Sequence, residues 1–207
     1  MSYVYKETKG ADGGPLLFTF HGTGGDESQF HGLGEQILPD AHVVSPRGDV
    51  SENGANRYFR RTGEGVYDMP DLAARTQAMA GFVRGFPTGD RPVIGLGYSN
   101  GANILASVAM ADPGLFTDIV LMHPLIPWVP DPVPALKRVN VLITAGRRDL
   151  ICSPAGTDFL ADWFREQGAD TTLYWHEGGH EIPQAEIQTA AEFVQSAENR
   201  WRRLHSL

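Results

Sequence analysis

The sequence has little of three things: cysteine, long apolar runs and clustered positive charge. Cys152 is the one cysteine among 207 residues, which rules out an internal disulfide and fits a reducing cytoplasmic location. No apolar run reaches the ~20 residues of a membrane span, and residues 1–8 lack the apolar core of a signal peptide. A net charge of −8 without a long run of Lys or Arg argues against a nucleic-acid partner. We therefore expect a cytoplasmic protein that acts on a small molecule.

The chain length and the order of apolar segments predict one α/β domain over residues 1–207, because 42% of the residues are hydrophobic and no linker divides them. Continuous apolar strands indicate a mostly parallel sheet with helices on both faces, and we expect no separate lid domain. Residues 1–8 are expected to add an antiparallel edge strand. Strands are predicted near 15–20, 41–45, 92–97, 117–122, 139–145 and 171–176, and helices near 27–38, 70–86, 100–111, 155–168 and 184–203.

The most informative motif is G-x-S-x-G at residues 97–101, directly after the apolar run 92–96. This pattern is typical of a sharp turn from a strand into a helix, which exposes the serine hydroxyl above the end of the sheet. A serine hydroxyl needs a base and a group that orients the base. Asp149 and His180 follow Ser99 in the chain order that such sites use, and each follows its own predicted strand. We predict that these three residues are catalytic.

The tetrahedral intermediate of such a reaction also needs two backbone N–H donors. The N–H of Asn100, next to the serine, is one candidate. The other is the N–H of Thr23, in a glycine-rich turn after the predicted strand 15–20. His21 is expected to brace this turn. The scheme requires no organic cofactor and no metal.

Two long irregular segments, 46–69 and 123–135, are expected to line the site, because loops of this length in a domain are usually functional. Their aromatic and apolar side chains predict a wall for an acyl or aryl group. The substrate-pocket candidates are Phe59, Tyr67, His123 and Trp128. A structural role is the preferred alternative for His123. Attraction of an anionic substrate is one interpretation of Arg57, Arg60 and Arg61. The preferred interpretation is that they are solvated or paired with Asp and Glu, as charges on a long loop usually are. Cys152 is expected to be a buried small hydrophobe.

The glycine-rich turn from His21 to Glu27, the serine motif, and the segments 146–149 and 179–181 together resemble the phospholipase/carboxylesterase branch of the α/β-hydrolases. The sequence is more similar to the small bacterial esterases of this branch than to its acyl-protein thioesterases. Residues 45–61 resemble a subgroup associated with aromatic, quinone-type compounds. The resemblance implies an esterase fold and a Ser-Asp-His triad, but the natural substrate does not carry over. We expect the substrate to be a small-molecule ester. A homodimer is compatible with it.

Other functions fit parts of the sequence. His176 to His180 matches the zinc-protease pattern H-E-x-x-H, but Gly178, Gly179 and Pro183 disfavour the helix that this pattern needs. Residues 95–101 resemble a dinucleotide fingerprint with its third glycine misplaced by one position. A thioesterase acting on acylated proteins would share the triad, and a non-catalytic ligand-binding protein could share the fold.

The acid is the triad member with the most rivals along the chain. Asp158, Asp162 and Glu177 lie near Asp149 in the sequence. The first two are expected on the helix after the strand, and Glu177 stands too close to His180 to reach back to its ring. Asp149→Asn is therefore expected to preserve the fold while removing most of the activity.

Overall fold

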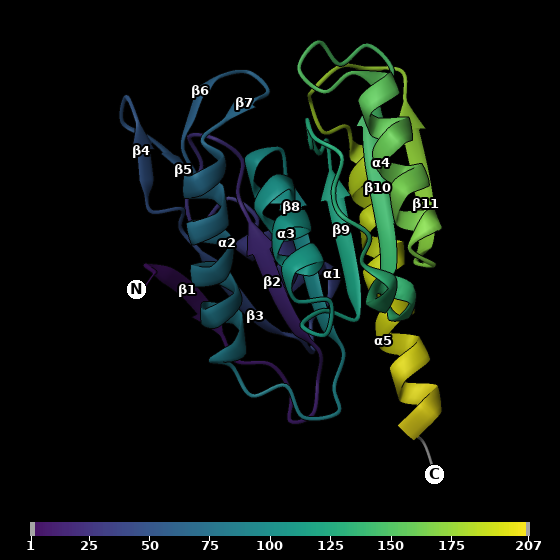
Figure 1. Cartoon of the computed structure of the whole chain (residues 1–207). Helices are drawn as coiled ribbons and strands as arrows, with labels where there is room; N and C mark the ends of the chain where they lie inside the picture. Colours follow the sequence, from purple (N-terminus) through teal and green to yellow (C-terminus); the bar gives the residue numbers. More distant parts are fainter. Residues whose placement is uncertain (1–2, 206–207) are drawn as a thin grey trace.

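The structure of the protein, a computed structural model, describes residues 3–205 and contains a seven-stranded sheet with helices on both faces (Figure 1). The strand order is β1-β3-β2-β8-β9-β10-β11. The first of these runs antiparallel to its neighbour, and the other neighbours are parallel. The bounds are β1 (Tyr5–Thr8), β2 (Leu16–Phe20), β3 (His42–Pro46), β8 (Val93–Tyr98), β9 (Asp118–Met122), β10 (Asn140–Gly146) and β11 (Asp170–His176). The predicted α/β class is confirmed, and residues 1–2 of the predicted edge strand lie outside the described residues.

Alternate residues of the central strands supply two separate hydrophobic cores, one on each face of the sheet. Leu16, Phe18 and Phe20 of β2 contribute to one core, whereas Leu17 contributes to the other. Both faces are therefore buried, which explains why the strands are continuously apolar. The helices α2 (Met69–Arg84), α3 (Asn100–Ala111) and α4 (Pro154–Glu166) cover the front of the sheet in Figure 1, and α1 (His31–Ile37) and α5 (Gln184–His205) lie behind it.

The first predicted helix, 27–38, is shorter in the structure because α1 begins at His31. The Asp26 side chain accepts a hydrogen bond from the Ser28 N–H (2.8 Å). This local bond holds the preceding residues in turns and competes with a helical conformation. Among the described helices, none is long and apolar enough to cross a membrane.

The segment 46–69 was predicted to be irregular, and this was wrong in part. It contains two short hairpins that reach the carboxyl end of the sheet, at the top of Figure 1. Asn53 and Gly54 have φ angles of 51° and 88°, as a two-residue turn with both central residues left-handed requires. The strands are β4 (Val50–Glu52), β5 (Ala55–Arg57), β6 (Arg61–Gly63) and β7 (Val66–Tyr67). The segment 123–135 is irregular as predicted, until the 3₁₀ helix η1 (Pro134–Arg138).

Candidate active site

Ser99 stands in a strained turn between β8 and α3. Its φ of 52° and ψ of −115° are rare for a residue with a side chain and cost about 1–3 kcal/mol. Its N–H donates to the Met122 carbonyl (2.9 Å). A Cβ atom on Gly97 would come within 2.5 Å of the Gly101 carbonyl oxygen, and one on Gly101 within 2.2 Å of the Phe20 carbonyl oxygen. The two glycines of the motif are therefore required by close backbone approach around the serine.

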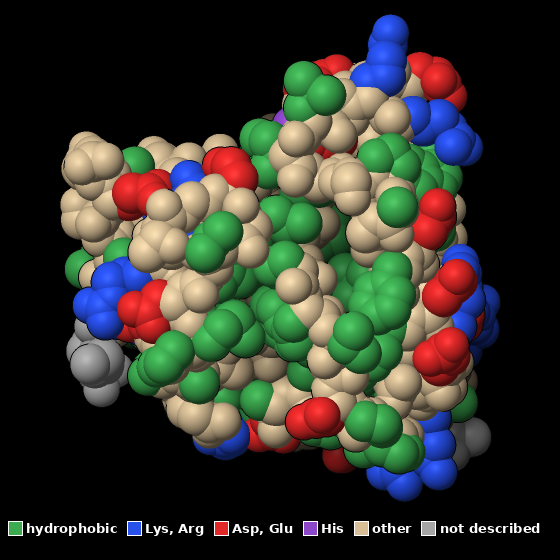
Figure 2. Space-filling view, turned by 45° about the horizontal axis from the view of Figure 1, so that its top comes forward, with side chains coloured by type: hydrophobic (Ala, Val, Ile, Leu, Met, Phe, Trp, Pro, Cys, Tyr) green, Lys and Arg blue, Asp and Glu red, His purple; other side chains and the backbone are tan. Residues whose placement is uncertain are grey.

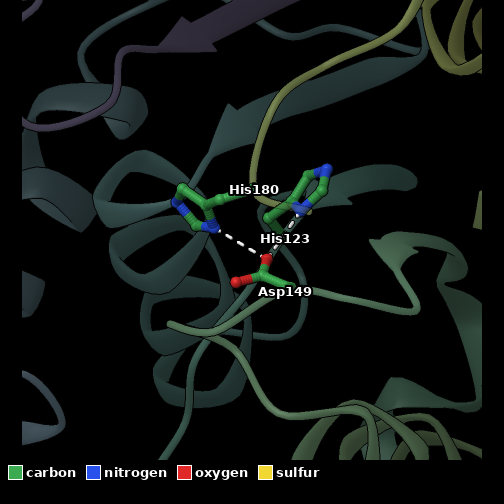
Figure 3. A group of neighbouring side chains, drawn as sticks. All are labelled: His123, Asp149 and His180. Atoms are coloured by element: carbon green, nitrogen blue, oxygen red, sulfur yellow. Dashed lines mark hydrogen bonds and ion pairs between the residues drawn. The ribbon is translucent and has the colours of Figure 1, made fainter. Parts of the chain in front are cut away.

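The side chains of Ser99, His180 and Asp149 form a hydrogen-bonded row. His180 Nε2 lies 2.9 Å from Ser99 Oγ, and His180 Nδ1 lies 2.7 Å from Asp149 Oδ2. Figure 3 shows the second of these contacts, with the imidazole and carboxylate facing each other. The His180 loop is held by the Tyr98 hydroxyl, which donates to the His180 carbonyl (2.6 Å). The row provides a hydroxyl, a base within reach of its proton and an acid that orients the base.

The loops that carry Asp149 and His180 are joined through their backbones. Arg147 N–H donates to the His176 carbonyl and Arg148 N–H to the Gly178 carbonyl, each at 2.9 Å. A Cβ atom on Gly146 would come within 2.0 Å of the Gly179 carbonyl oxygen. Glycine at the end of β10 therefore allows the close approach that brings the acid and the imidazole together.

Asp149 is buried and accepts four hydrogen bonds. Its Oδ1 accepts from the N–H groups of Ile151 (2.8 Å) and Cys152 (2.9 Å), and its Oδ2 faces the Nδ1 atoms of His180 and His123. Burial raises the pKa of this carboxyl, but the hydrogen bonds from Cys152, the two histidines and Ile151 outweigh burial and lower it. The carboxylate is therefore held in its charged form.

His123 lies behind the acid and is fully buried, so it does not line the cavity as the pocket prediction had it, and its position fits the preferred alternative, a structural role. Its Nδ1 lies 2.9 Å from Asp149 Oδ2 (Figure 3) and its Nε2 lies 3.1 Å from Glu186 Oε2. His176 Nε2 lies 3.3 Å from the same Glu186 oxygen. Burial lowers the pKa of His123, but the hydrogen bonds and charges of Glu186 and Asp149 outweigh burial and raise it. In its imidazolium form the ring donates from Nδ1 to Asp149 and from Nε2 to Glu186, and its Nε2 also lies 3.4 Å from His176 Nε2.

Glu186 is the member of this cluster that the sequence analysis missed. It lies in the first turn of α5, is fully buried, and accepts a hydrogen bond from the Thr144 hydroxyl. Acidic residues are common in first helical turns because they interact favourably with the helix dipole. The local pattern therefore carried no signal that this glutamate turns inward to a histidine.

Two groups of described residues bring three potential metal ligands together: His123 with Asp149 and His180, and His123 with His176 and Glu186. In the first group the nitrogens lie 2.7 and 2.9 Å from one carboxylate oxygen, closer than the ~3.3 Å between ligand atoms around a tetrahedral zinc. In the second, Gly178 N–H donates to His176 Nδ1 (3.0 Å), so the ring proton lies on Nε2, the atom a metal would need. Hydrogen bonding explains both groups.

The H-E-x-x-H alternative fails on local structure. His176 ends β11, and His180 lies in the following loop, not on a helix. The two rings have different partners, because His180 faces Ser99 and His176 faces Glu186, so they do not point at a common metal site.

The two predicted backbone donors, Thr23 N–H and Asn100 N–H, make no hydrogen bond within the described residues. Both residues line the cavity that contains Ser99. The Thr23 turn is braced by His21, whose Nε2 accepts from Gly48 N–H (2.9 Å) and whose Nδ1 therefore donates to the Gly22 carbonyl (2.7 Å). These hydrogen bonds hold the turn, and Thr23 within it, at the cavity.

The β4–β5 hairpin also holds the Thr23 turn. Gly24 N–H donates to the Asn56 carbonyl (3.0 Å), and Asn56 Nδ2 donates to the Gly25 carbonyl (2.9 Å). The guanidinium of Arg57 donates from Nη1 to the Thr23 hydroxyl (2.7 Å). The geometry of the candidate oxyanion site therefore depends on a hairpin outside the main sheet.

The cavity in front of Ser99 has a volume of about 170 Å³ and a more polar wall than the sequence predicts. Tyr67 lines it as predicted, and its hydroxyl donates to the Leu125 carbonyl (2.7 Å). Cys152 also lines it, and burial raises the pKa of its thiol, which disfavours the reactive thiolate. The other lining residues are Thr23, Arg57, Arg61, Glu64, Tyr98, Ser99, Asn100, Asn103, Leu125, Ile151 and His180.

Phe59 and Trp128 do not line this cavity, which corrects the prediction for both. Each packs its ring edge-on against Tyr67, with centroids 4.8 and 6.2 Å away. Phe59 is fully buried, and Trp128 lines a separate groove with Met69 and Leu72. Figure 2 shows hydrophobic side chains gathered over the middle of this side of the molecule, with charged side chains toward its edges. The aromatic residues form a layer behind Tyr67.

The three arginines of the segment 46–69 differ in their surroundings. Arg60 contacts Asp71 (3.2 Å), and Arg61 contacts Glu52 (3.0 Å) and Glu64 (2.7 Å), as the pairing interpretation predicts. Arg57 is different, because it is 2% exposed and forms no ion pair with a described residue. The expectation of a solvated or paired side chain was therefore wrong for Arg57.

A parallel sheet with helices on both faces, and a strained serine after a central strand, define the class of α/β-hydrolases. The family described as "Serine hydrolase (FSH1)" matches residues 129–191, which include Asp149 and His180. The chain is 37% identical to the Bacillus subtilis (strain 168) protein "Putative hydrolase MhqD" over 203 residues, which cover 95% of this chain and 99% of that protein.

Two solved structures are similar over almost the whole chain. Atu2452 from Agrobacterium tumefaciens, of unknown function, is 50% identical with a TM-score of 0.89, and the match covers 94% of this chain and 97% of that one. The Bacillus cereus carboxylesterase is 34% identical with a TM-score of 0.88, over 94% of each chain. The chain therefore belongs to the phospholipase/carboxylesterase branch of the α/β-hydrolases, and it is a carboxylesterase-type serine hydrolase.

Proposed function

We propose that the protein hydrolyses small acyl or aryl esters through an acyl-enzyme on Ser99. The observation that carries this proposal is the position of His180, with Nε2 2.9 Å from the Ser99 hydroxyl and Nδ1 2.7 Å from the Asp149 carboxylate. The carboxylate fixes the ring with its proton on Nδ1 and leaves Nε2 free to accept a proton.

In the proposed reaction, Ser99 Oγ attacks the ester carbonyl while its proton passes to His180 Nε2. The negative charge that develops on the carbonyl oxygen is stabilised by the N–H groups of Thr23 and Asn100. The C–O bond to the alcohol then breaks, and His180 returns the proton to the leaving oxygen. Water, deprotonated by His180, attacks the acyl-enzyme in the same way and releases the acid.

The size of the cavity supports a small substrate. Its volume of about 170 Å³ is below the ~300–1,000 Å³ of sites that enclose drug-sized ligands. We expect short acyl or aryl groups to be preferred over long acyl chains.

The experiment combines covalent labelling with a substrate series. A fluorophosphonate should label Ser99, and Ser99→Ala should abolish labelling and hydrolysis. A label mapped to another residue would contradict the proposed nucleophile.

Aryl, alkyl and thioester substrates of increasing acyl length then define the preference by kcat/KM. A kcat/KM that keeps rising beyond about eight carbons, at the ~0.8 kcal/mol expected per buried methylene, would contradict the short-chain preference. Faster turnover of thioesters than of matched esters would favour the thioesterase alternative.

A further inference from the structure

Arg57 is a buried cation beside the reactive serine. Its side chain is 2% exposed, yet it lines the same cavity as Ser99 and His180, so the small part that remains accessible faces the cavity. A charge taken out of water is costly unless a counter-charge or hydrogen bonds compensate it. The surroundings of its guanidinium therefore indicate what the cavity is built to receive.

The protein provides hydrogen-bond acceptors for only some of the donors of this guanidinium. Of its five N–H donors, Nε donates to the Phe59 carbonyl (3.1 Å) and Nη1 donates to the Thr23 hydroxyl (2.7 Å). Its carbon lies 5.3 Å from the centre of the Phe59 ring. The other donors have no acceptor among the described residues. Both acceptors are neutral, so the positive charge has no direct partner.

The nearby carboxylates are engaged elsewhere. Glu64, which lines the cavity, contacts Arg61 at 2.7 Å, and Glu52 contacts the same arginine at 3.0 Å. Burial and the charge of Arg61 lower the pKa of Arg57, although arginine stays protonated. Arg57 and Arg61 together balance Glu52 and Glu64 in charge, but among the described residues no carboxylate contacts the Arg57 guanidinium itself.

We propose that Arg57 binds a carboxylate on the substrate, so that the preferred esters are those whose acyl or alcohol part carries a negative charge. This inference rests on the proposed function of the same site. A planar guanidinium suits a carboxylate because it can donate two parallel hydrogen bonds. The contact to Thr23 places this anion subsite next to one proposed oxyanion donor, so a bound carboxylate would orient the scissile carbonyl.

The test compares charged and neutral substrates of the same shape. For the alcohol part the pair is 3-acetoxybenzoate and 3-acetoxybenzamide. For the acyl part it is mono-4-nitrophenyl adipate and the 4-nitrophenyl ester of adipic acid monoamide. We expect the wild-type kcat/KM to favour the charged member of at least one pair by about 10- to 100-fold, as for hydrogen bonds to a charged group. The pair that shows the preference identifies the part of the substrate that carries the charge.

Arg57→Met should remove that preference, so that kcat/KM falls about 10- to 100-fold more for the charged member than for the neutral member, which loses only the support that Arg57 gives to the Thr23 turn. Arg57→Lys should retain part of the preference, since it keeps the charge without the planar pair of donors. Arg60→Met is the matched control, because Arg60 is paired and lies outside the cavity. Equal loss for both members would overturn the proposal and assign Arg57 to the support of Thr23. No wild-type preference in either pair would also overturn it.

A binding measurement separates this proposal from the proposed function. Calorimetry on Ser99→Ala should detect isophthalate more strongly than isophthalamide, and the additional Arg57→Met change should remove the difference. If Ser99 is not labelled and no ester is cleaved, but isophthalate binds through Arg57, the anion subsite stands and the proposed function fails. If Ser99 is labelled and isophthalate does not bind, the anion subsite alone is overturned.

Discussion

His123 Nδ1 lies 2.9 Å from Asp149 Oδ2, and both side chains are completely buried. The oxygen that faces this histidine is the same one that faces His180 Nδ1 at 2.7 Å. One carboxylate oxygen therefore serves two imidazoles, one at the cavity and one inside the protein. Glu186, on the far side of His123, extends this buried row of alternating carboxylates and imidazoles.

The first prediction concerns the pH dependence of stability. Because the pKa of His123 is raised above its ordinary 6.5 in the folded protein, its ion pairs stabilise the fold fully below pH 6.5 and are lost as pH rises through the raised pKa. His123→Asn keeps a residue that tolerates the φ of 51° at this position. The free energy of unfolding, measured with urea, should differ more between wild type and variant at pH 6 than at pH 9.

His42→Asn, a change of a buried histidine of β3, is the control for loss of an imidazole elsewhere in the fold. If the free energies of unfolding of wild type and His123→Asn differ equally at pH 6 and pH 9, His123 is neutral in the folded protein.

The second prediction concerns Asp149→Asn. The variant should lose about 10⁴ in kcat, because the amide no longer holds His180 in the required tautomer. The sequence alone predicts an unchanged fold. The structure adds that His123 would lose a charged partner, so the free energy of unfolding should also fall by about 3–5 kcal/mol.

The exposed Asp158→Asn on α4 should change neither kcat nor stability appreciably. A variant at Asp149 that keeps more than about a tenth of wild-type kcat, against the ~10⁴ expectation, would show that another group orients His180.

A third prediction compares two glycines. Gly97→Ala should disrupt the serine turn, since the new methyl would lie 2.5 Å from a backbone oxygen that cannot move aside. Gly81 is exposed within α2 with no atom within 4 Å of an added Cβ, so Gly81→Ala should stabilise the protein by about 1 kcal/mol. Thermal unfolding and esterase assays on both variants check this. Full activity of the Gly97 variant would contradict the close approach.

The fourth prediction concerns the wall of the cavity. Tyr67 lies between the Ser99 cavity and the Trp128 ring, so Tyr67→Ala should open space for a longer acyl group. Each additional methylene that becomes buried should raise kcat/KM by about 4-fold, from ~0.8 kcal/mol each. Trp128→Ala, in the separate groove, should leave the preference of wild type unchanged. The measurement is kcat/KM for esters of increasing acyl length in wild type, Tyr67→Ala and Trp128→Ala.

The sequence was enough to predict that the three triad candidates lie together, because the parallel topology of the sheet positions them. Ser99, Asp149 and His180 each follow a strand of one parallel sheet, and the carboxyl ends of such strands meet at one edge. The β4–β5 hairpin could also be predicted from the sequence, because Asn53-Gly54 is a strong signal for a two-residue hairpin turn.

The burial of Arg57 and the pairing of His123 with Glu186 could not be predicted from the sequence. Sequence spacing does not determine which distant side chains are enclosed together, and the histidine and glutamate are 63 positions apart. Long-range packing alone decides their protonation and their role.

The β4–β5 hairpin couples two properties that could have been independent. It fixes the Thr23 turn through Asn56 and places the Arg57 cation in the cavity. A substitution there that changes the anion preference also loosens the turn that carries Thr23, a proposed oxyanion donor. Shifts in selectivity at this hairpin should therefore carry a loss of rate, and restoring the rate would require compensating changes in the 22–25 turn.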